Sequence, residues 1–335
     1  MVQESNHSDW RPQASWTVLR KRAEMLRLIR KYFFDQNVLE VETPILSSAA
    51  ATDPHIESFI TTYEGPGLVN KRPMYLHSSP EFPMKRLLAA GSGAIYQVCK
   101  VFRDGECGDK HNPEFTMIEW YRPGFDLAKM MNDVEQLVAR LLGESRMVFE
   151  RLSYAEVFSR HLDFNPHTAG LDVLRNATSQ AGINTVEGLH DDDRNGYLDL
   201  LLTHIIEPKL GCDVPCFVYD YPASQAALAQ LRPGGGGRDI AVAERFELYM
   251  NGCELANGYF ELRDSDELLK RIQRDHASRQ KISAKDVPAD SHLLAAMSHG
   301  LPACSGVALG FDRLVMLAVG AQVLDEVLAF PFARA

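Results

Sequence analysis

Three charged side chains stand in a stretch whose other residues predict buried strands. The stretch FRDGECGDKHNPEFTMIEWY (102–121) contains Arg103, His111 and Glu119. An apolar run leads into Arg103, a polar loop with glycines follows, and apolar and acidic residues then alternate imperfectly, which predicts two strands joined by a hairpin loop. Burying a charge is costly unless a partner or ligand neutralises it. The pattern therefore predicts a ligand that contacts these three side chains.

A second group of acidic residues lies in ERFELYMNGCELANGYFELRD (244–264), where Glu247, Glu254 and Glu261 recur every seven residues. In one helix they would form a solvated stripe, but two Asn-Gly pairs make a single helix unfavourable. A strand, a turn at Asn251-Gly252 and a second strand fit better. In such a hairpin, Glu247 and Glu254 are expected to lie opposite each other across the turn.

Two carboxylates that face each other repel unless a cation lies between them. Carboxylate oxygens combined with phosphate oxygens are a typical Mg²⁺ environment. Arg103 and Arg313, from distant segments, supply the guanidinium groups that a polyphosphate needs. Together these residues predict a nucleotide site with two metal carboxylates and two phosphate-binding arginines. Scattered buried ion pairs are the alternative, and they would not explain why the charges concentrate in strand-like segments.

Several predicted elements must position these groups. Residues 15–36 are expected to form an amphipathic helix, and its basic residues between Arg20 and Lys31 are either a solvated face or an approach surface for an anionic partner. A strand at 38–46 should stop at Pro44. The segment 74–88 is predicted to be a strand that enters a helix, with Ser78 and Ser79 as N-caps.

The remaining elements follow from the same patterns. Helices are expected in the middle of the chain, where they provide packing or an inserted cap over a site, and two more are expected near the end. A strand at 214–222 precedes a glycine loop at 233–237, and a strand that enters a helix at 305–320 places Arg313 at the junction. The expected helices cover 126–142, 153–162, 168–181, 190–207, 265–281 and 290–299.

Composition limits the classes of function. Of the 335 residues, 45% are apolar and 24% are charged, which is typical of globular proteins. No apolar run is long enough to span a membrane, and the N-terminus lacks the apolar core of a signal peptide. Six cysteines in a long chain favour a reduced, cytoplasmic location over a disulfide framework. The net charge of −10 argues against broad nucleic-acid contact.

The chain resembles the catalytic domain of class II aminoacyl-tRNA synthetases, and within them the lysyl branch. FFDQNVLEVETPIL, with Pro44, is similar to motif 1, which forms dimers; VFRDGECGDKHNPEFTMIEWY is similar to motif 2 and GVALGFDRLVML to motif 3. HNPEFTMIEWY and LANGYFEL are specific for the lysine branch. The resemblance covers the chain from about Leu19 to the C-terminus. It implies an α+β fold, in which helices flank a mixed, mostly antiparallel sheet, and a homodimer.

The resemblance also implies roles for individual residues. Arg103 would hold the α-phosphate and the substrate carboxylate, and Phe115 and Arg313 would stack on the two faces of adenine. Glu247 and Glu254 would carry Mg²⁺. The further ATP-binding residues implied are Asp104, Gly105, His111, Asn112, Leu248 and Gly310, and the substrate-binding residues are Ser79, Pro80, Glu81, Glu119, Tyr121, Glu254, Asn257, Tyr259, Glu261 and Ala308.

The implied chemistry fits these residue types. A lysine has two ammonium groups, so its pocket needs carboxylates at both ends, and Glu81 and Glu261 suit those roles. Activation is an in-line attack of the amino acid carboxylate on the α-phosphate of ATP, which releases pyrophosphate. Positioning and charge neutralisation by Arg103 and Arg313 are sufficient catalysis, and no protein nucleophile is needed.

Departures from the synthetases narrow the expected function. Residues 1–18 form a short extension before a catalytic domain at 19–335, which includes a helical insertion around 126–210, and no anticodon-binding barrel is expected. The chain is therefore similar to stand-alone paralogues that ligate (R)-β-lysine to a lysine of elongation factor P. YPASQAALAQ (221–230) agrees, and Ala308 replaces a synthetase glycine beside the amino acid pocket. This resemblance implies ATP and Mg²⁺, no tRNA and no membrane as partners.

Two alternatives and one departure stay open. A truncated synthetase would charge tRNA or a tRNA-like RNA, and an inactive regulatory paralogue would bind a partner but would have lost ATP arginines or metal carboxylates. Motif 2 usually reads Arg-x-Glu, but here Gly105 takes the glutamate position and Glu106 follows. Either Glu106 replaces that contact or adenine loses a hydrogen bond, which changes the affinity by roughly 1 kcal/mol.

Overall fold

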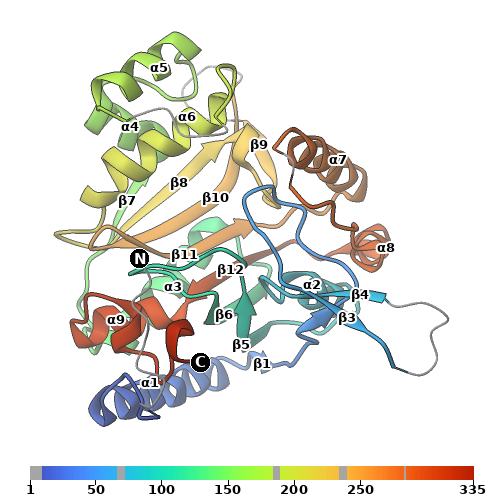
Figure 1. The fold of residues 1–335 in the computed structure, drawn as a ribbon, viewed down its shortest axis with the longest axis vertical. Coiled ribbons are helices and arrows are strands. Elements are labelled where there is room, and N and C mark those ends of the chain that lie inside the picture. Colours follow the sequence, from blue (N-terminus) through green and yellow to red (C-terminus); the bar gives the residue numbers. More distant parts are fainter. Residues whose placement is uncertain (1–9, 66–71, 184–188, 234–239, 283) are drawn as a thin grey trace.

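A nine-stranded mixed sheet forms the centre of the computed structural model (Figure 1), which describes residues 10–65, 72–183, 189–233, 240–282 and 284–335. The strand order is β1-β5-β6-β12-β11-β10-β8-β7, and β9 pairs with β10. The β1–β5 and β7–β8 pairs are parallel and the other pairs are antiparallel. The predicted α+β fold with a mostly antiparallel sheet is confirmed. The strands are β1 (Leu39–Glu40), β5 (Ile95–Phe102), β6 (Glu114–Pro123), β7 (Glu150–Ser153), β8 (Cys216–Pro222), β9 (Leu231–Pro233), β10 (Ala241–Met250), β11 (Cys253–Phe260) and β12 (Cys304–Gly310).

A small three-stranded sheet lies beside the main one, in the order β2 (Leu46–Ser47), β4 (Arg72–Leu76) and β3 (Ile60–Tyr63). The single strand expected at 38–46 is wrong, because only β1 and β2 form there, separated by a segment that contains Pro44. The helices are α1 (Trp16–Asp35), α2 (Glu81–Ala89), α3 (Leu127–Leu142), α4 (Tyr154–Leu162), α5 (Leu171–Gln180), α6 (Arg194–Leu201), α7 (Ser265–Lys281), α8 (Ser291–Gly300) and α9 (Phe311–Val319). The glycine loop expected at 233–237 lies, after Pro233, outside the described residues.

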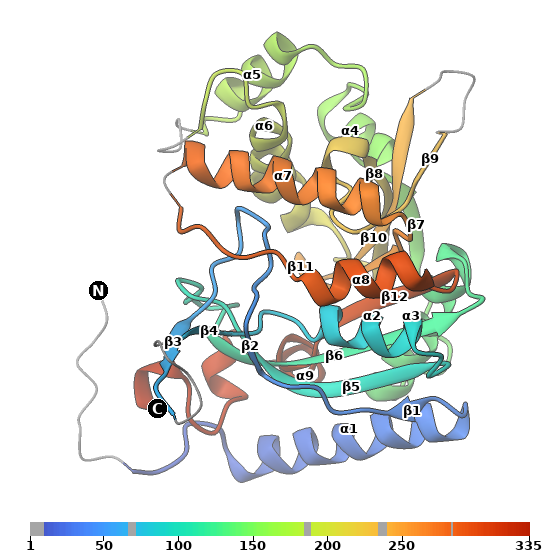
Figure 2. The ribbon, with the colours of Figure 1, turned by 90° about the vertical axis from the view of Figure 1, so that its right-hand side faces the viewer.

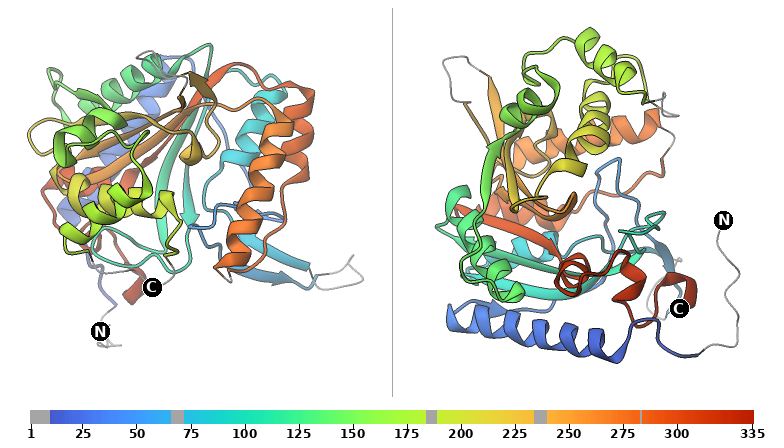
Figure 3. Two further views of the ribbon diagram at one scale, coloured as in Figure 1. Left: turned by 90° about the horizontal axis from the view of Figure 1, so that it is seen from above. Right: turned by 90° about the vertical axis from the view of Figure 1, so that its left-hand side faces the viewer.

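The helices distribute over the sheet in two groups. Helices α1, α3 and α9 pack into the largest apolar core together with β5, β6, β11 and β12, and Figure 2 shows α1 on the side opposite α2, α7 and α8. Helices α4 and α6 pack on β8 and β10 in a second core that includes Tyr154, Phe158 and Leu198. Figure 3 shows the segment with α4, α5 and α6 at the end of the molecule away from α1. No helix of the described part is long and apolar enough to cross a membrane.

Both predicted hairpins form, and their registers decide which side chains meet. In β5 and β6, Gln97 pairs with Glu119. In β10 and β11, the turn residues Asn251 and Gly252 have φ values of 51° and 62°, a left-handed conformation that suits Asn-Gly. The register shifts at Leu248/Tyr249, so that Glu247 pairs with Asn257 and Glu254 with Tyr249. The expectation that Glu247 and Glu254 face each other directly is therefore wrong, although the bulge leaves both lining one cavity.

Part of the basic surface expected on α1 is buried. Arg22 forms an ion pair with Asp312 of α9 (Nη1 to Oδ1, 2.5 Å) and donates a hydrogen bond to the Thr116 hydroxyl of β6 (2.8 Å). The Thr116 amide donates to the other Asp312 oxygen at 2.8 Å. The solvated-face interpretation is wrong for Arg22, because tertiary packing of α1 on β6 and α9 removes it from water. This clamp joins the segments that carry motifs 1, 2 and 3.

We predict that Arg22→Met lowers the free energy of unfolding by roughly 3 kcal/mol, because it leaves the buried Asp312 carboxylate without its cation. Arg27→Met, at an exposed position of the same helix, is the matched control and should change stability by less than about 0.5 kcal/mol. Urea unfolding of both variants measures the difference. Equal stabilities of the two variants would show that the clamp contributes nothing.

Candidate active site

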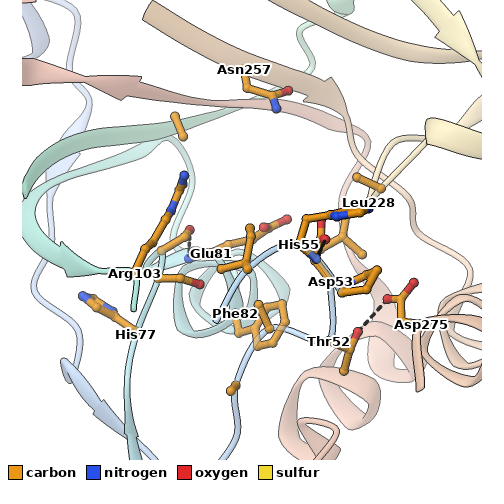
Figure 4. Close-up of a pocket in the computed structure, with 18 of the residues that line it drawn as sticks. Thr52, Asp53, His55, His77, Glu81, Phe82, Arg103, Leu228, Asn257 and Asp275 are labelled. Carbon is orange, nitrogen blue, oxygen red and sulfur yellow. Dashed lines mark hydrogen bonds between the residues drawn. The ribbon is translucent and has the colours of Figure 1, made fainter. Parts of the chain in front are cut away.

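A single large cavity of about 1510 Å³ collects most of the predicted site residues. Its walls come from α2, the strands β6, β10, β11 and β12, the start of α9 and the loop around residues 48–56. Figure 4 shows Arg103, Glu81 and Asn257 on three different elements around the same space. The predicted residues that line it are Ser79, Glu81, Arg103, His111, Asn112, Phe115, Glu119, Tyr121, Glu247, Glu254, Asn257, Tyr259, Glu261, Ala308, Gly310 and Arg313.

Four predicted residues do not line the cavity with their side chains. Pro80 is the N-cap of α2, and Leu248 is fully buried in the main core on the other side of β10. The Asp104 amide donates to the Glu57 carbonyl at 2.9 Å. Gly105 has a φ of 83°, a left-handed conformation that a glutamate at this position would adopt only with strain. The departure from Arg-x-Glu therefore goes together with a turn that suits glycine, and Glu106 rather than residue 105 borders the cavity.

Two arginines form a cationic cluster in the cavity. Arg313 donates to the carbonyls of Glu254 (2.7 Å) and Lys110 (3.1 Å), and its Nη2 lies 2.7 Å from His111 Nε2. Burial and the positive charge of Arg313 lower the pKa of His111, so a neutral imidazole accepts this hydrogen bond. The Arg103 guanidinium lies 5.1 Å from the centre of the Phe115 ring. The backbone thus holds Arg313 in place while Arg103 lies over an aromatic face.

The two predicted metal carboxylates differ in environment. Glu247 is buried and already accepts hydrogen bonds from Tyr221 (2.6 Å), Tyr249 (2.5 Å) and Arg245 (2.5 Å). Burial and the neighbouring Glu247 raise the pKa of Glu254 to about 7. Sequence patterns did not predict the three partners of Glu247. Positions 245, 247 and 249 alternate along one strand, and this spacing could have indicated that Arg245 and Tyr249 lie near Glu247. Tyr221 comes from β8, and only the fold shows that it contacts Glu247.

A second group of carboxylates lines the cavity around Glu119. Glu119 accepts hydrogen bonds from Ser79 (2.6 Å) and Tyr121 (2.7 Å), and burial followed by repulsion from Glu81 raises its pKa to about 8. Burial raises the pKa of Glu261 to about 7. The close packing here explains Gly306, because a Cβ there would lie 2.4 Å from the Glu261 Oε1 atom and 2.3 Å from the Tyr121 ring. A group of three carboxylates suits a cationic ligand.

Lys85 is a further buried residue beside this group that sequence patterns did not predict. Its ammonium group lies 2.6 Å from Glu81 Oε1 and 2.7 Å from Glu261 Oε2. The spacing of four residues from Glu81 on a helix was a signal for the first contact. The second contact depends on how α2 packs against the end of β11.

Comparison with known proteins identifies the family. A family model described as class II tRNA synthetases (D, K and N) matches residues 2–334. The chain belongs to this family. Among curated class II relatives, proteins named elongation factor P–(R)-β-lysine ligase are similar over almost their full length: 49% identical in Yersinia enterocolitica (99% of this chain, 100% of the relative), 47% in Pectobacterium carotovorum (99% and 100%) and 46% in Vibrio atlanticus (98% and 99%). The resemblance to class II synthetases and to their stand-alone paralogues is confirmed.

The raised pKa of Glu119 predicts a pH-dependent stability difference. A carboxyl whose pKa is higher in the folded than in the unfolded chain stabilises the fold below its unfolded pKa, and this contribution is lost as the pH rises towards the folded value. For Glu119 the window runs from its ordinary value of 4.5 to about 8. Relative to the ligand-free wild type, Glu119→Gln should therefore gain stability between pH 5 and pH 8, on the order of 1 to 3 kcal/mol.

Urea unfolding at several pH values checks this expectation. Glu114→Gln, at an exposed position of the same strand, is the control and should show a pH dependence like that of the wild type. A difference between Glu119→Gln and the wild type that does not change with pH would contradict the assignment.

Proposed function

We propose that this class II family member is an ATP-dependent ligase that activates (R)-β-lysine as an adenylate and transfers it to a lysine side chain of elongation factor P. The observation that carries the proposal is the polarity of the cavity. Arg103 and Arg313 form one cluster near His111, and Glu81, Glu119 and Glu261 form another. A polyphosphate and a diamino acid match these two clusters by charge. The full-length similarity to ligases named for (R)-β-lysine and elongation factor P supports the same assignment.

Activation would proceed by positioning. The ammonium groups of the amino acid bind among the carboxylates, and Arg103 directs its carboxylate at the α-phosphorus of ATP. The new carboxylate–phosphorus bond forms as the bond to the bridging oxygen of the β-phosphate breaks, and pyrophosphate leaves. Arg103 and Arg313 stabilise the negative charge that develops on the phosphoryl oxygens.

In the second step, the β-lysyl group is transferred from the adenylate to the acceptor lysine. The uncharged ε-amino group of the acceptor lysine attacks the carbonyl carbon, the bond to the phosphate oxygen of AMP breaks, and an amide forms with loss of a proton from nitrogen. The acceptor would approach through the part of the cavity that continues from Glu81 to the loop around Asp53 and to the α7 residue Asp275. Figure 4 shows Thr52 hydrogen-bonded to Asp275 across this part of the cavity.

Mg²⁺ is part of the proposal, with Glu247 and Glu254 as its protein ligands. The raised pKa of Glu254 beside Glu247 fits a cation site, because a bound cation would favour the ionised form of both. Within the described residues, no group of three or more His, Cys, Asp or Glu is arranged to hold a metal ion. The other ligands would therefore be phosphate oxygens and water. Bound there, Mg²⁺ would supply positive charge to the phosphates.

We further propose a cytoplasmic homodimer. The exposed apolar side chains of Phe34 on α1 (82% accessible) and Leu39 on β1 (57%) support self-association through the segment that resembles motif 1. All six cysteines carry free thiols, which supports a reducing compartment.

Two other functions receive less support. For tRNA charging, the candidate surface on α1 loses Arg22 to the clamp with Asp312, and Arg30 pairs with Glu40 at 3.1 Å. We therefore propose no tRNA partner. For an inactive paralogue, residues of the ATP site should be missing, but Arg103, Glu254 and Arg313 all line the cavity together with Glu247.

An acceptor competition tests the function. Purified protein, ATP, Mg²⁺ and labelled (R)-β-lysine or α-lysine are mixed with both elongation factor P and total tRNA. We expect ribonuclease-resistant label and a mass increase of one lysyl unit on the factor, with β-lysine preferred. Label that ribonuclease removes would instead establish tRNA charging, and the absence of any ATP–pyrophosphate exchange would favour the inactive paralogue.

Ala308 provides a test of the choice between the two lysines. On β12 it pairs with Asn257 of β11 and Glu119 of β6, so its methyl group lies between two predicted substrate residues. Ala308→Gly should raise the use of α-lysine relative to β-lysine by about tenfold, because the added space around the α-carbon admits an α-amino group. The ratio of kcat/KM values measures this, and an unchanged ratio would contradict the assignment.

A further inference from the structure

Lys85 is a fully buried lysine in contact with two of the carboxylates that line the cavity. Its side chain is 2% accessible, and its ammonium group forms ion pairs with Glu81 (2.6 Å) and Glu261 (2.7 Å). A buried lysine without partners would lose its proton, but these two carboxylates raise the pKa of Lys85 above its ordinary value despite burial. The residue is thus a cation held directly behind the carboxylates of a pocket proposed to bind a cation.

The charges in this part of the cavity explain why a cation belongs there. When a bound cation favours the ionised forms of Glu81, Glu119 and Glu261, these groups together present three negative charges, one more than the two ammonium groups of a diamino acid. Lys85 neutralises one of the three. Each ion pair uses a single oxygen of Glu81 and of Glu261. The Gly306 backbone also hydrogen-bonds the Glu261 carboxylate, so the free oxygen of the more accessible Glu81 is the one that remains for the substrate.

We propose that Lys85 is a positioning residue that holds Glu81 and Glu261 as oriented carboxylates and matches the pocket to a substrate with two ammonium groups. This inference rests on the proposed activation of a diamino acid. Lys85 would not touch the reacting atoms; it would act through the two glutamates.

The groups around Lys85 support this assignment. Glu81 on α2, Glu261 directly after β11 and Cys304 on β12 lie near Lys85 itself. Glu119 and Tyr121 from β6 and Tyr259 from β11 lie near its two glutamates. Helix α8 also packs on α2, and its two histidines, His292 and His299, are exposed. Among these neighbours, the carboxyls of Glu81 and Glu261 are the groups in ion-pair contact with the ammonium group.

Removing the charge should change the pH dependence of substrate use. In Lys85→Met, Glu81 and Glu261 lose the cation between them. Because Lys85 lowers the pKa of Glu261, its removal lets Glu261 take up a proton at neutral pH, and the pair attracts the substrate less. We expect KM for (R)-β-lysine to rise about tenfold or more at pH 7. In the plot of kcat/KM against pH, the acidic limb should move to higher pH by about one pH unit. Lys85→Arg keeps the charge and should keep the wild-type pH profile.

The experiment measures ATP–pyrophosphate exchange between pH 6 and pH 9, together with ATP binding. Lys100→Met removes an exposed lysine that pairs with Glu114 (3.3 Å) and is the matched control; its profile should equal that of the wild type. Lys85→Gln is a second neutral variant that retains polar contacts if Lys85→Met fails to fold. The acidic limb of the kcat/KM profile of Lys85→Gln should also move to higher pH.

The outcomes separate the inference from the function on which it rests. If neutral variants bind ATP and lose activity equally at every pH, Lys85 has only a structural role and the inference is wrong. If the wild type itself does not activate a diamino acid, the proposed function fails instead. A shifted limb in both neutral variants and none in Lys85→Arg establishes the positioning role.

Discussion

Burial of several carboxylates in one cavity is the constraint on which the rest of this structure depends. An isolated buried charge costs several kcal/mol, so each must be paired, protonated or neutralised by a ligand. Glu247 is paired with Arg245 and two tyrosines, and Lys85 stands between Glu81 and Glu261. Glu119 and Glu254 keep raised pKa values. Glu254 lies 3.8 Å from the Arg313 guanidinium and Glu119 accepts hydrogen bonds from two hydroxyls, and a cationic substrate or a metal ion would stabilise the ionised forms of both further.

The central sheet arranges this chemistry through register. Glu119, Ala308 and Asn257 form one row across β6, β12 and β11, so three residues far apart in the chain meet on one face. Two residues further along β12 and β6, Gly306 pairs with Tyr121, and any side chain at 306 would collide with the Tyr121 ring and the Glu261 carboxylate. Because side chains alternate between faces, a slip of one residue would move this row out of the cavity.

Buried arginines connect the cavity walls to the rest of the fold. Arg279 of α7 donates to the Asp53 carbonyl (2.9 Å) and to the Glu57 carboxylate (2.6 Å), and the Glu57 carbonyl in turn accepts from the amide beside Arg103. On the other side, Arg22 joins α1 to Asp312, the neighbour of Arg313. Arg103 and Arg313, the two arginines proposed to be catalytic, are therefore each next to a residue that contacts one of these ion-paired groups, and both ion pairs span more than 200 residues of sequence.

Local sequence determined much of the fold. Both hairpins, the helices and the junction that carries Arg313 could be predicted, because hydrophobic period, caps and Asn-Gly turns are local signals. Motif residues such as Arg103, Glu119 and Glu261 could also be predicted as site residues, since buried charges in strands are unusual. Only the tertiary structure decided that Glu247 does not oppose Glu254, that Arg22 is buried and that Lys85 lies between two glutamates. A bulge changes register by one residue, and burial depends on which elements pack together, so neither property is encoded in local spacing.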